Sequence, residues 1–159
     1  MGDERMSHTD PKAANSNRRI LALDVGTKRI GVAVSDALGW TAQGLTVLAR
    51  EPASRLWEEL ERLLQQYDVG EIVVGYPKNM DGTVGPRAKE VEAFARELER
   101  HFSLPVRFWD ERLSTVAAER SLLEADMSRK KRRRQVDRIA AVWILQGYLQ
   151  ARGAREHDR

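Results

Sequence analysis

The chain has no cysteine among its 159 residues. This absence excludes disulfide bonds, thiolate metal ligands and a thiol nucleophile. No apolar run approaches the roughly 20 residues that a membrane-spanning helix needs, and segment 1–18 lacks the apolar centre of a secretory signal. Histidine is also scarce, with three copies, so few imidazoles are available for a zinc site. Together these absences favour a cytoplasmic protein that does not associate with membranes.

The composition that remains is typical of one soluble domain. Hydrophobic residues make up 42% and charged residues 32%, with a formal net charge of +3 and a pI of about 9.4. At this length one well-packed domain is expected. No linker or internal repeat divides the chain, so we expect a single domain over 19–152. The polar segment 1–18 is predicted to be a flexible tail and 153–159 a frayed tail.

One stretch, ILALDVGTKRIGVAVSD at 20–36, combines an apolar strand with a charged turn. Its first half is a continuous apolar run, which is typical of a central strand covered on both faces. Asp24 ends that run, and a carboxylate at such a position needs a metal, a cation or hydrogen-bond donors as partners. Gly26 follows in the turn and would leave room for a phosphate beside Lys28 and Arg29. The alternative is a hairpin in which Asp24 caps the turn.

The order of the remaining elements predicts an α/β fold. Hydrophobic periodicity and turn residues indicate strands at 19–25, 29–35, 41–49, 71–77 and 106–109, and helices at about 52–67, 87–101, 114–125 and 135–151. Three strands joined by short turns form an antiparallel meander, and the later strands alternate with helices as parallel crossovers do. We therefore expect one mixed five-stranded sheet flanked by helices.

Carboxylates stand at the ends of these predicted elements. Asp24 ends the first strand, and Asp110 and Glu111 end the last. Asp137 lies on the apolar stripe of the final helix, which should face the sheet. If these side chains converge at one sheet edge, hard oxygen ligands without cysteine suit Mg²⁺ or Mn²⁺, and two ions could clamp a phosphodiester. The alternative is that Asp137 only complements the helix dipole and Glu111 is solvated.

Cations surround the same predicted edge. Six consecutive basic residues precede Asp137, namely Arg129, Lys130, Lys131, Arg132, Arg133 and Arg134. Such a run repels itself in a helix, so we expect a mobile loop that contacts a phosphate backbone rather than a merely solvated stretch. The basic track would be extended by Lys28, Arg29, Lys78, Arg87 and Arg112.

Four motifs, in order, resemble the YqgF family of RuvX-type proteins: LDVGTKRIGVAVSD, VVGYPKNMDGTVG, DERLSTVAA and VDRIAAVWIL. The resemblance covers about residues 19–150. It implies an RNase H-like fold and divalent-metal-dependent cleavage of phosphodiester bonds, either in 5′-end processing of pre-16S rRNA or in resolution of Holliday junctions. The family's acidic positions fall on Asp24, Glu111 and Asp137, with Asp110 adjoining. The second motif implies that Lys78, Asn79 and Gly82 lie near the substrate.

Two other classes of function fit parts of the sequence. Asp24 to Thr27 after an apolar strand also resembles the phosphate loop of actin-like ATPases and sugar kinases, and Asp81-Gly82-Thr83 repeats the theme. Those proteins need two lobes, and this chain is too short for both. A nucleic-acid-binding protein without catalysis would use the basic run, but it leaves an acid on a buried helix stripe unexplained. No feature of the sequence fixes the oligomeric state, although symmetrical cutting of a junction requires a homodimer.

Overall fold

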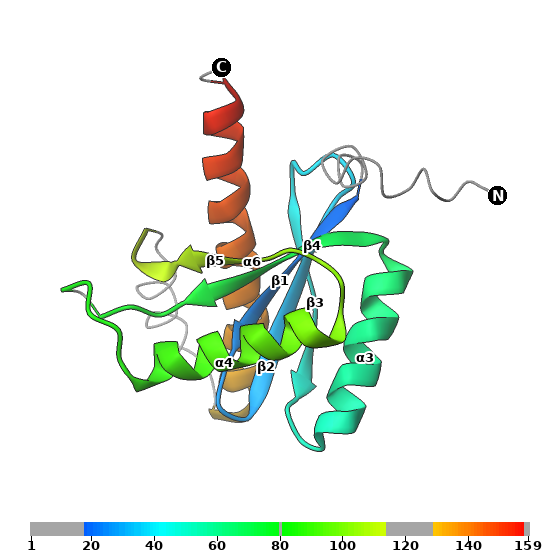
Figure 1. Cartoon of the computed structure of the whole chain (residues 1–159), viewed down its shortest axis with the longest axis vertical. Coiled ribbons are helices and arrows are strands. Elements are labelled where there is room, and N and C mark those ends of the chain that lie inside the picture. The colour runs from blue at the N-terminus through cyan, green and yellow to red at the C-terminus, as the bar shows by residue number, and fades with distance from the viewer. Residues whose placement is uncertain (1–17, 80, 114–128, 158–159) are drawn as a thin grey trace.

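The computed structural model describes residues 18–79, 81–113 and 129–157 (Figure 1). Its elements are β1 (Arg19–Val25), β2 (Arg29–Ser35), β3 (Ala42–Ala49), α3 (Ala53–Gln66), β4 (Val69–Tyr76), α4 (Pro86–His101), β5 (Val106–Asp110), a short 3₁₀ turn η1 (Glu111–Leu113) and α6 (Arg129–His157). The predicted helix at 114–125 and nearly all of the predicted tail at 1–18 lie outside the described residues.

The five strands form one mixed sheet in the order β3-β2-β1-β4-β5. Strands β1, β2 and β3 pair antiparallel, whereas β4 pairs parallel to both β1 and β5. This confirms the predicted meander followed by parallel crossovers. Strand β1 is central, as its apolar run predicts, because every residue from Ile20 to Val25 is buried.

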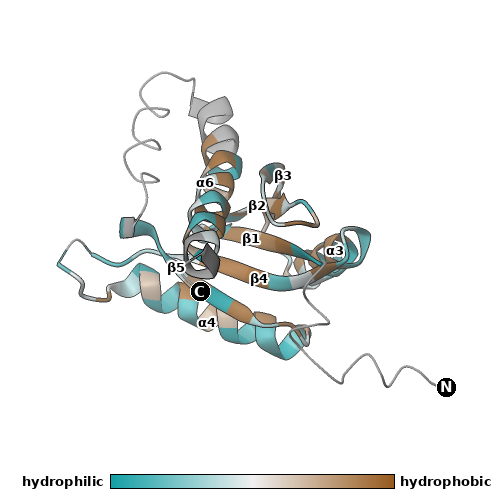
Figure 2. Ribbon diagram, turned by 90° about the horizontal axis from the view of Figure 1, so that it is seen from above, coloured by the Kyte–Doolittle hydropathy of each residue, from teal (hydrophilic) through white to brown (hydrophobic). Residues whose placement is uncertain are grey.

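Helices cover both faces of the sheet (Figure 2). Alternate residues of β1 divide between two cores: Leu21 and Leu23 pack in the core beneath α3 and α4, whereas Ile20 and Ala22 pack beneath α6. Near Asp137, the residues that α6 contributes to this second core include two small ones, Ala140 and Ala141. A helix with alanines at its contact face lies close to the sheet, which brings its polar neighbours to the strand ends.

Helix α6 begins six residues earlier than predicted, because the basic run at 129–134 is helical. The prediction of a mobile loop for this run is therefore wrong. Lysine and arginine have high helix propensity, and a pair of like charges four residues apart on a helix costs only about 0.2–0.5 kcal/mol. The helix also extends past the predicted end at 151, to His157.

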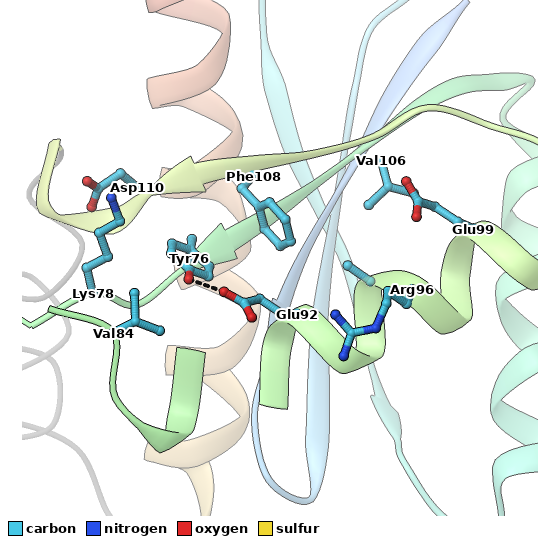
Figure 3. A pocket seen from close by; sticks show the side chains of 10 residues that line it. Tyr76, Lys78, Val84, Glu92, Arg96, Glu99, Val106, Phe108 and Asp110 are labelled. Carbon is cyan, nitrogen blue, oxygen red and sulfur yellow. Dashed lines mark hydrogen bonds between the residues drawn. The ribbon is translucent and has the colours of Figure 1, made fainter. Parts of the chain in front are cut away.

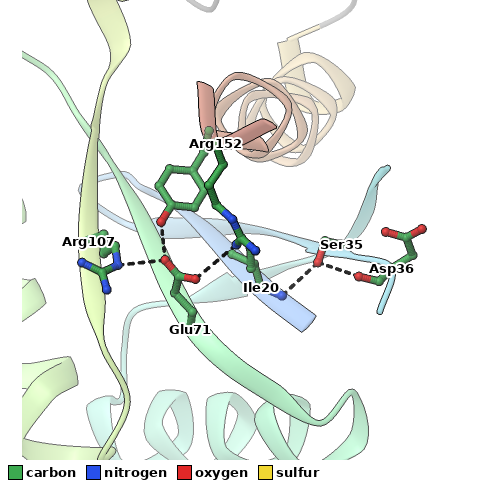
Figure 4. Close-up of polar contacts among 7 residues, drawn as sticks. Ile20, Ser35, Asp36, Glu71, Arg107 and Arg152 are labelled. Carbon is green, nitrogen blue, oxygen red and sulfur yellow. Dashed lines mark hydrogen bonds and ion pairs between the residues drawn. The ribbon is translucent and has the colours of Figure 1, made fainter. Parts of the chain in front are cut away.

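Polar contacts fix the C-terminal half of α6 to the opposite end of the sheet from Asp24 (Figure 4). The Tyr148 hydroxyl donates a hydrogen bond to Glu71 on β4. The Glu71 carboxylate also pairs with Arg107 on β5 at 2.9 Å and with Arg152 on α6 at 3.4 Å. Burial and this hydrogen bond raise the pKa of Tyr148 to about 12. These contacts thus fix the orientation of α6 across the sheet at the end that lies away from Asp24.

Candidate functional site

Asp24 lies at the end of the central strand and faces α6. It has the strand parity of Ile20 and Ala22, which belong to the core beneath that helix. Its side chain is almost completely buried, with 3% of its surface exposed. Across β2 its partner in register is Gly31. On β4 the corresponding position is Gly75, one residue beyond the paired Leu23 and Val74. Asp24 is therefore flanked on both sides by residues without side chains.

Gly31 brings α6 into direct contact with the sheet at Asp137. A β-carbon placed on Gly31 would lie 1.9 Å from the backbone oxygen of Asp137, which no side chain tolerates. The Asp137 carboxylate in turn accepts a hydrogen bond of 3.0 Å from the Arg29 guanidinium on the same strand. A close helix–strand contact thus places Asp137 beside the strand position that pairs with Asp24.

Glu111 reaches the other flanking glycine. A β-carbon on Gly75 would lie 2.7 Å from the Glu111 side-chain oxygen and 2.5 Å from Ile144 of α6. Since Ile144 belongs to the core beneath α6, the Glu111 side chain lies on the same face as Asp24. Glu111 follows β5 directly and opens the 3₁₀ turn, which lets it fold back over Gly75.

Asp24, Glu111 and the backbone of Asp137 therefore lie along one row of the sheet, formed by Gly75, Asp24 and Gly31, while the Asp137 carboxylate is directed to Arg29 beside that row. Their carboxylate oxygens are the donors that Mg²⁺ and Mn²⁺ prefer, so the chemistry of the set fits a divalent cation. Among residues 18–79, 81–113 and 136–153, however, no three acidic or histidine side chains form a ready-made metal cluster. One reason is that the Asp137 carboxylate forms an ion pair with Arg29.

The structure places Asp110 apart from these three acids. Its carboxylate lines a cavity against α4, on the opposite face of the sheet. It accepts hydrogen bonds from Arg112, the shortest of them 2.9 Å from the guanidinium. These hydrogen bonds hold the pKa of Asp110 below its ordinary value despite partial burial. Of the two acids that end β5, Glu111 is the one that faces Asp24.

The predicted cations occupy several different environments. Lys28 is exposed in the β1–β2 turn, and Lys78 lies over the Tyr76 ring at 5.9 Å. Arg112 is paired with Asp110, and Arg87 donates to the Val25 backbone oxygen at 3.3 Å. The basic run forms the first turns of α6, directly before Asp137.

Sequence reasoning identified Gly26 and Arg29 in the turn after Asp24 but missed Arg50 and the two glycines that flank Asp24. The Gly26 backbone N–H donates a hydrogen bond of 2.8 Å to the backbone oxygen of Arg29. A β-carbon on Gly26 would lie 2.8 Å from the same oxygen. Closure of the turn therefore requires a glycine here, and the phosphate position that we expected beside it stays a prediction. Arg50 of the neighbouring segment braces the turn by donating to the Gly26 oxygen at 2.9 Å. Glycines inside apolar strands mark close approaches, and this signal could have identified Gly31 and Gly75.

The second motif forms a loop closed by its own side chains. Asp81 accepts hydrogen bonds from the Thr83 backbone and hydroxyl at 3.0 and 2.7 Å, and Asn79 donates to Thr83 at 2.9 Å. Gly82 has a φ of +90°, which favours glycine. Asp81-Gly82-Thr83 is thus an Asx-type turn and does not repeat the strand-end geometry of Asp24.

Comparison with known proteins identifies close relatives. A family model described as "RuvX: Holliday junction resolvase" matches residues 18–151. A Moorella thermoacetica protein named "Putative pre-16S rRNA nuclease" is 57% identical over 135 residues, covering 85% of this chain and 96% of the relative. A Desulfitobacterium hafniense protein of the same name is 59% identical over 131 residues, covering 82% and 91%.

Solved structures show the same fold at low sequence identity. A Thermus thermophilus RuvC structure in complex with a Holliday junction substrate is 13% identical, with a TM-score of 0.52, and the match covers 85% of this chain and 95% of that one. A second Thermus thermophilus RuvC structure is 14% identical, with a TM-score of 0.50 and coverages of 86% and 96%. The sheet order and these matches confirm the RNase H-like fold that the resemblance implies.

Proposed function

Because the chain belongs to the family described as RuvX: Holliday junction resolvase, we propose that it is a divalent-metal-dependent nuclease that hydrolyses phosphodiester bonds in structured nucleic acid. The observation that carries this proposal is the row of Gly75, Asp24 and Gly31: Asp24 is nearly buried in it, the Glu111 carboxylate reaches over Gly75, and the backbone of Asp137 lies against Gly31 with its carboxylate on the neighbouring Arg29. Asp24 weighs most in this argument, because a carboxylate that is only 3% exposed at a strand end is costly unless it has partners, and a metal ion is one such partner.

In the proposed mechanism Asp24, Glu111 and Asp137 would hold Mg²⁺ or Mn²⁺, with two ions expected. Bound ions would supply Lewis-acid stabilisation of the phosphodiester oxygens in an in-line displacement. Asp24 would be the most buried of these ligands, since 3% of its surface is exposed, and burial keeps competing water away from its carboxylate. Lys28 and Arg29 hold the substrate phosphate beside the strand end, and the basic first turns of α6 bind the flanking backbone.

The names of the relatives point to two substrates. The curated relatives are named for pre-16S rRNA, and the family description is that of a Holliday junction resolvase. Our proposal for this chain is 5′-end processing of pre-16S rRNA, because the relatives that carry this name are 57–59% identical to it. Resolution of junctions is the second candidate, and it requires a homodimer because symmetrical cutting needs two active sites.

The other two classes of function have weaker support. The described residues form a single five-stranded sheet, whereas an actin-like or sugar-kinase-like ATPase encloses its nucleotide between two lobes. A binding protein without catalysis gives no reason for a nearly buried carboxylate, Asp24, at the end of the central strand. No helix in the described part of the chain has the length and apolar character to cross a membrane.

The decisive variant is Asp24→Asn, which keeps the shape of the side chain and removes its charge. We expect it to lower the cleavage rate of a pre-16S rRNA 5′ fragment in Mg²⁺ or Mn²⁺ by at least about 100-fold, and to change the dissociation constant for that RNA less than about threefold. Asp68→Asn is the matched control, because Asp68 is exposed at the opposite end of the sheet and asparagine tolerates its φ of 50°.

The same preparation is then compared on RNA and on a four-way DNA junction, with its mass in solution measured in parallel. Cleavage of the RNA alone by a monomer supports rRNA processing, and paired cuts in the junction by a dimer support the second candidate. Undiminished cleavage by Asp24→Asn on either substrate would rule out the proposed site.

A further inference from the structure

A cavity of about 630 Å³ lies on the face of the sheet that the three carboxylates do not use (Figure 3). It is bounded by the ends of β4 and β5 on one side and by α4 on the other. Its volume falls within the range of small-molecule sites, about 300–1,000 Å³. Nothing in the nuclease mechanism requires it, because the carboxylate row faces α6.

Two aromatic rings form the strand side of this cavity. Tyr76 and Phe108 lie side by side on β4 and β5, with ring centroids 5.0 Å apart and an interplanar angle of 52°. The Tyr76 hydroxyl donates a hydrogen bond to Glu92 on α4, which fixes that ring. Phe108, in contrast, is 44% exposed. An exposed phenylalanine beside an anchored ring provides an apolar face on which a flat group can stack.

Charged groups of both signs surround the aromatic rings. Lys78 lies at one end of the cavity, and Arg96 lines its α4 side. Among the described residues Arg96 takes part in no ion pair, whereas Glu92 is already bonded to Tyr76. An aromatic surface with nearby cations and carboxylate acceptors matches a nucleotide, whose base stacks and donates amino hydrogens while its phosphate binds cations.

The cavity also lies next to the candidate catalytic edge. Gly75 and Tyr76 are consecutive on β4, so they face opposite sides of the sheet. Asp110 and Glu111 repeat this arrangement at the end of β5: Asp110 lines the cavity, and Glu111 reaches over Gly75. The two sites therefore lie on opposite faces of the same sheet edge. When a substrate phosphate lies beside Asp24, the base of a neighbouring nucleotide can reach the cavity around that edge.

We propose that this cavity binds an unstacked nucleobase of the substrate strand, held against Phe108, with the phosphates on its two sides nearest to Lys78 and to Arg96 respectively. The proposal rests on the proposed nuclease function for the identity of the ligand. It gives the enzyme a preference for substrates with an unpaired nucleotide beside the scissile bond, because a fully paired strand cannot release a base into the cavity.

The test compares two RNA hairpins that differ only in whether one nucleotide beside the cleavage position is paired, with 2-aminopurine at that nucleotide. Binding is measured in EDTA, so that it does not depend on catalysis. Phe108→Ala is expected to weaken binding of the unpaired hairpin about tenfold, at the lower end of the range for loss of one base stack. Its binding of the paired hairpin should change less than twofold, and Phe108→Trp should preserve both affinities.

Leu38→Ala is the matched control, because Leu38 is likewise an exposed large apolar side chain and lies outside the cavity. It should leave both affinities within twofold of the wild type. Equal losses for Phe108→Ala on the two hairpins, or no loss on either, would overturn the proposal. A thermal melt shows whether each variant is folded.

A second measurement needs no variant. In the wild-type protein, 4-thiouridine at the unpaired position should crosslink to peptides that contain Tyr76 or Phe108, and crosslinking confined to other peptides would overturn the proposal. If the wild-type protein binds neither hairpin, the nuclease function itself fails. Binding that is insensitive to Phe108→Ala refutes only the base site.

Discussion

The Arg29 guanidinium lies 3.0 Å from the Asp137 carboxylate, which joins the first residue of β2 to α6 across 108 positions of sequence. Both side chains are largely buried, with 30% and 23% of their surfaces exposed. A cation thus already neutralises one of the three acids proposed to hold the metal. A divalent ion that takes Asp137 as a ligand must compete with Arg29 or share the carboxylate with it.

Arg29→Gln should therefore strengthen metal binding. Removing the competing cation is expected to lower the dissociation constant for Mn²⁺ several-fold in titration calorimetry without substrate, since a partly exposed charge pair contributes on the order of 1 kcal/mol. Lys28→Gln removes the same charge from the neighbouring, exposed position and should change the constant less than twofold. Weaker Mn²⁺ binding by Arg29→Gln would show that the guanidinium supports the site instead of competing for it.

The two acids that end β5 should differ sharply in their effect on catalysis. Glu111→Gln is expected to lower kcat at least about 100-fold, because the Glu111 side chain lies over Gly75 on the α6 face. Asp110→Asn should lower kcat less than about threefold, because that carboxylate faces α4 and pairs with Arg112. Single-turnover cleavage separates kcat from binding. The reverse order of effects would place the metal ligand on the opposite face of the sheet.

Gly31→Ala should destabilise the fold, because the new β-carbon would lie 1.9 Å from the Asp137 backbone oxygen and force α6 away from β2. Overpacking of this kind costs about 1–3 kcal/mol in the free energy of unfolding, measured by urea denaturation. Gly153→Ala is the matched control: it lies within α6 with no atom near the new β-carbon, and it should gain up to about 1 kcal/mol from helix propensity. Equal stability of the two variants would contradict the close contact.

The sequence was sufficient to predict the sheet, because its signals are local. The apolar run of 20–23 requires two covered faces, and short turns after 25 and 35 allow only antiparallel neighbours. The prediction for the basic run at 129–134 was wrong. Its like charges suggested a loop, whereas lysine and arginine have high helix propensity and the run is helical. The sequence also left Asp110 and Glu111 undistinguished. Strand alternation separates their faces, but only the position of α6, set by packing over distant residues such as Gly31 and Gly75, shows which face carries the site.

The contact between Tyr148 and Glu71 should make stability depend on alkaline pH. Burial and the hydrogen bond to Glu71 raise the pKa of Tyr148 from 10.0 to about 12. The stabilisation is therefore complete below about pH 10 and is lost as the pH rises towards 12. Between these values the free energy of unfolding of the wild type should fall more steeply than that of Tyr148→Phe, measured by urea denaturation. Parallel curves would show that this hydroxyl titrates normally in the folded protein.

The helical basic run should determine how nucleic-acid binding depends on salt. Replacing Arg132, Arg133 and Arg134 by glutamine removes charge at the start of α6, and glutamine preserves helix propensity. Each phosphate contact contributes about 0.7–0.9 to the slope of log K against log salt, so the slope should flatten by at least about one. The matched control replaces Arg55, Arg62 and Arg100, exposed on α3 and α4, and should leave the slope unchanged. Equal flattening in both triple variants would mean that overall charge, and not the position of the run beside Asp137, governs binding.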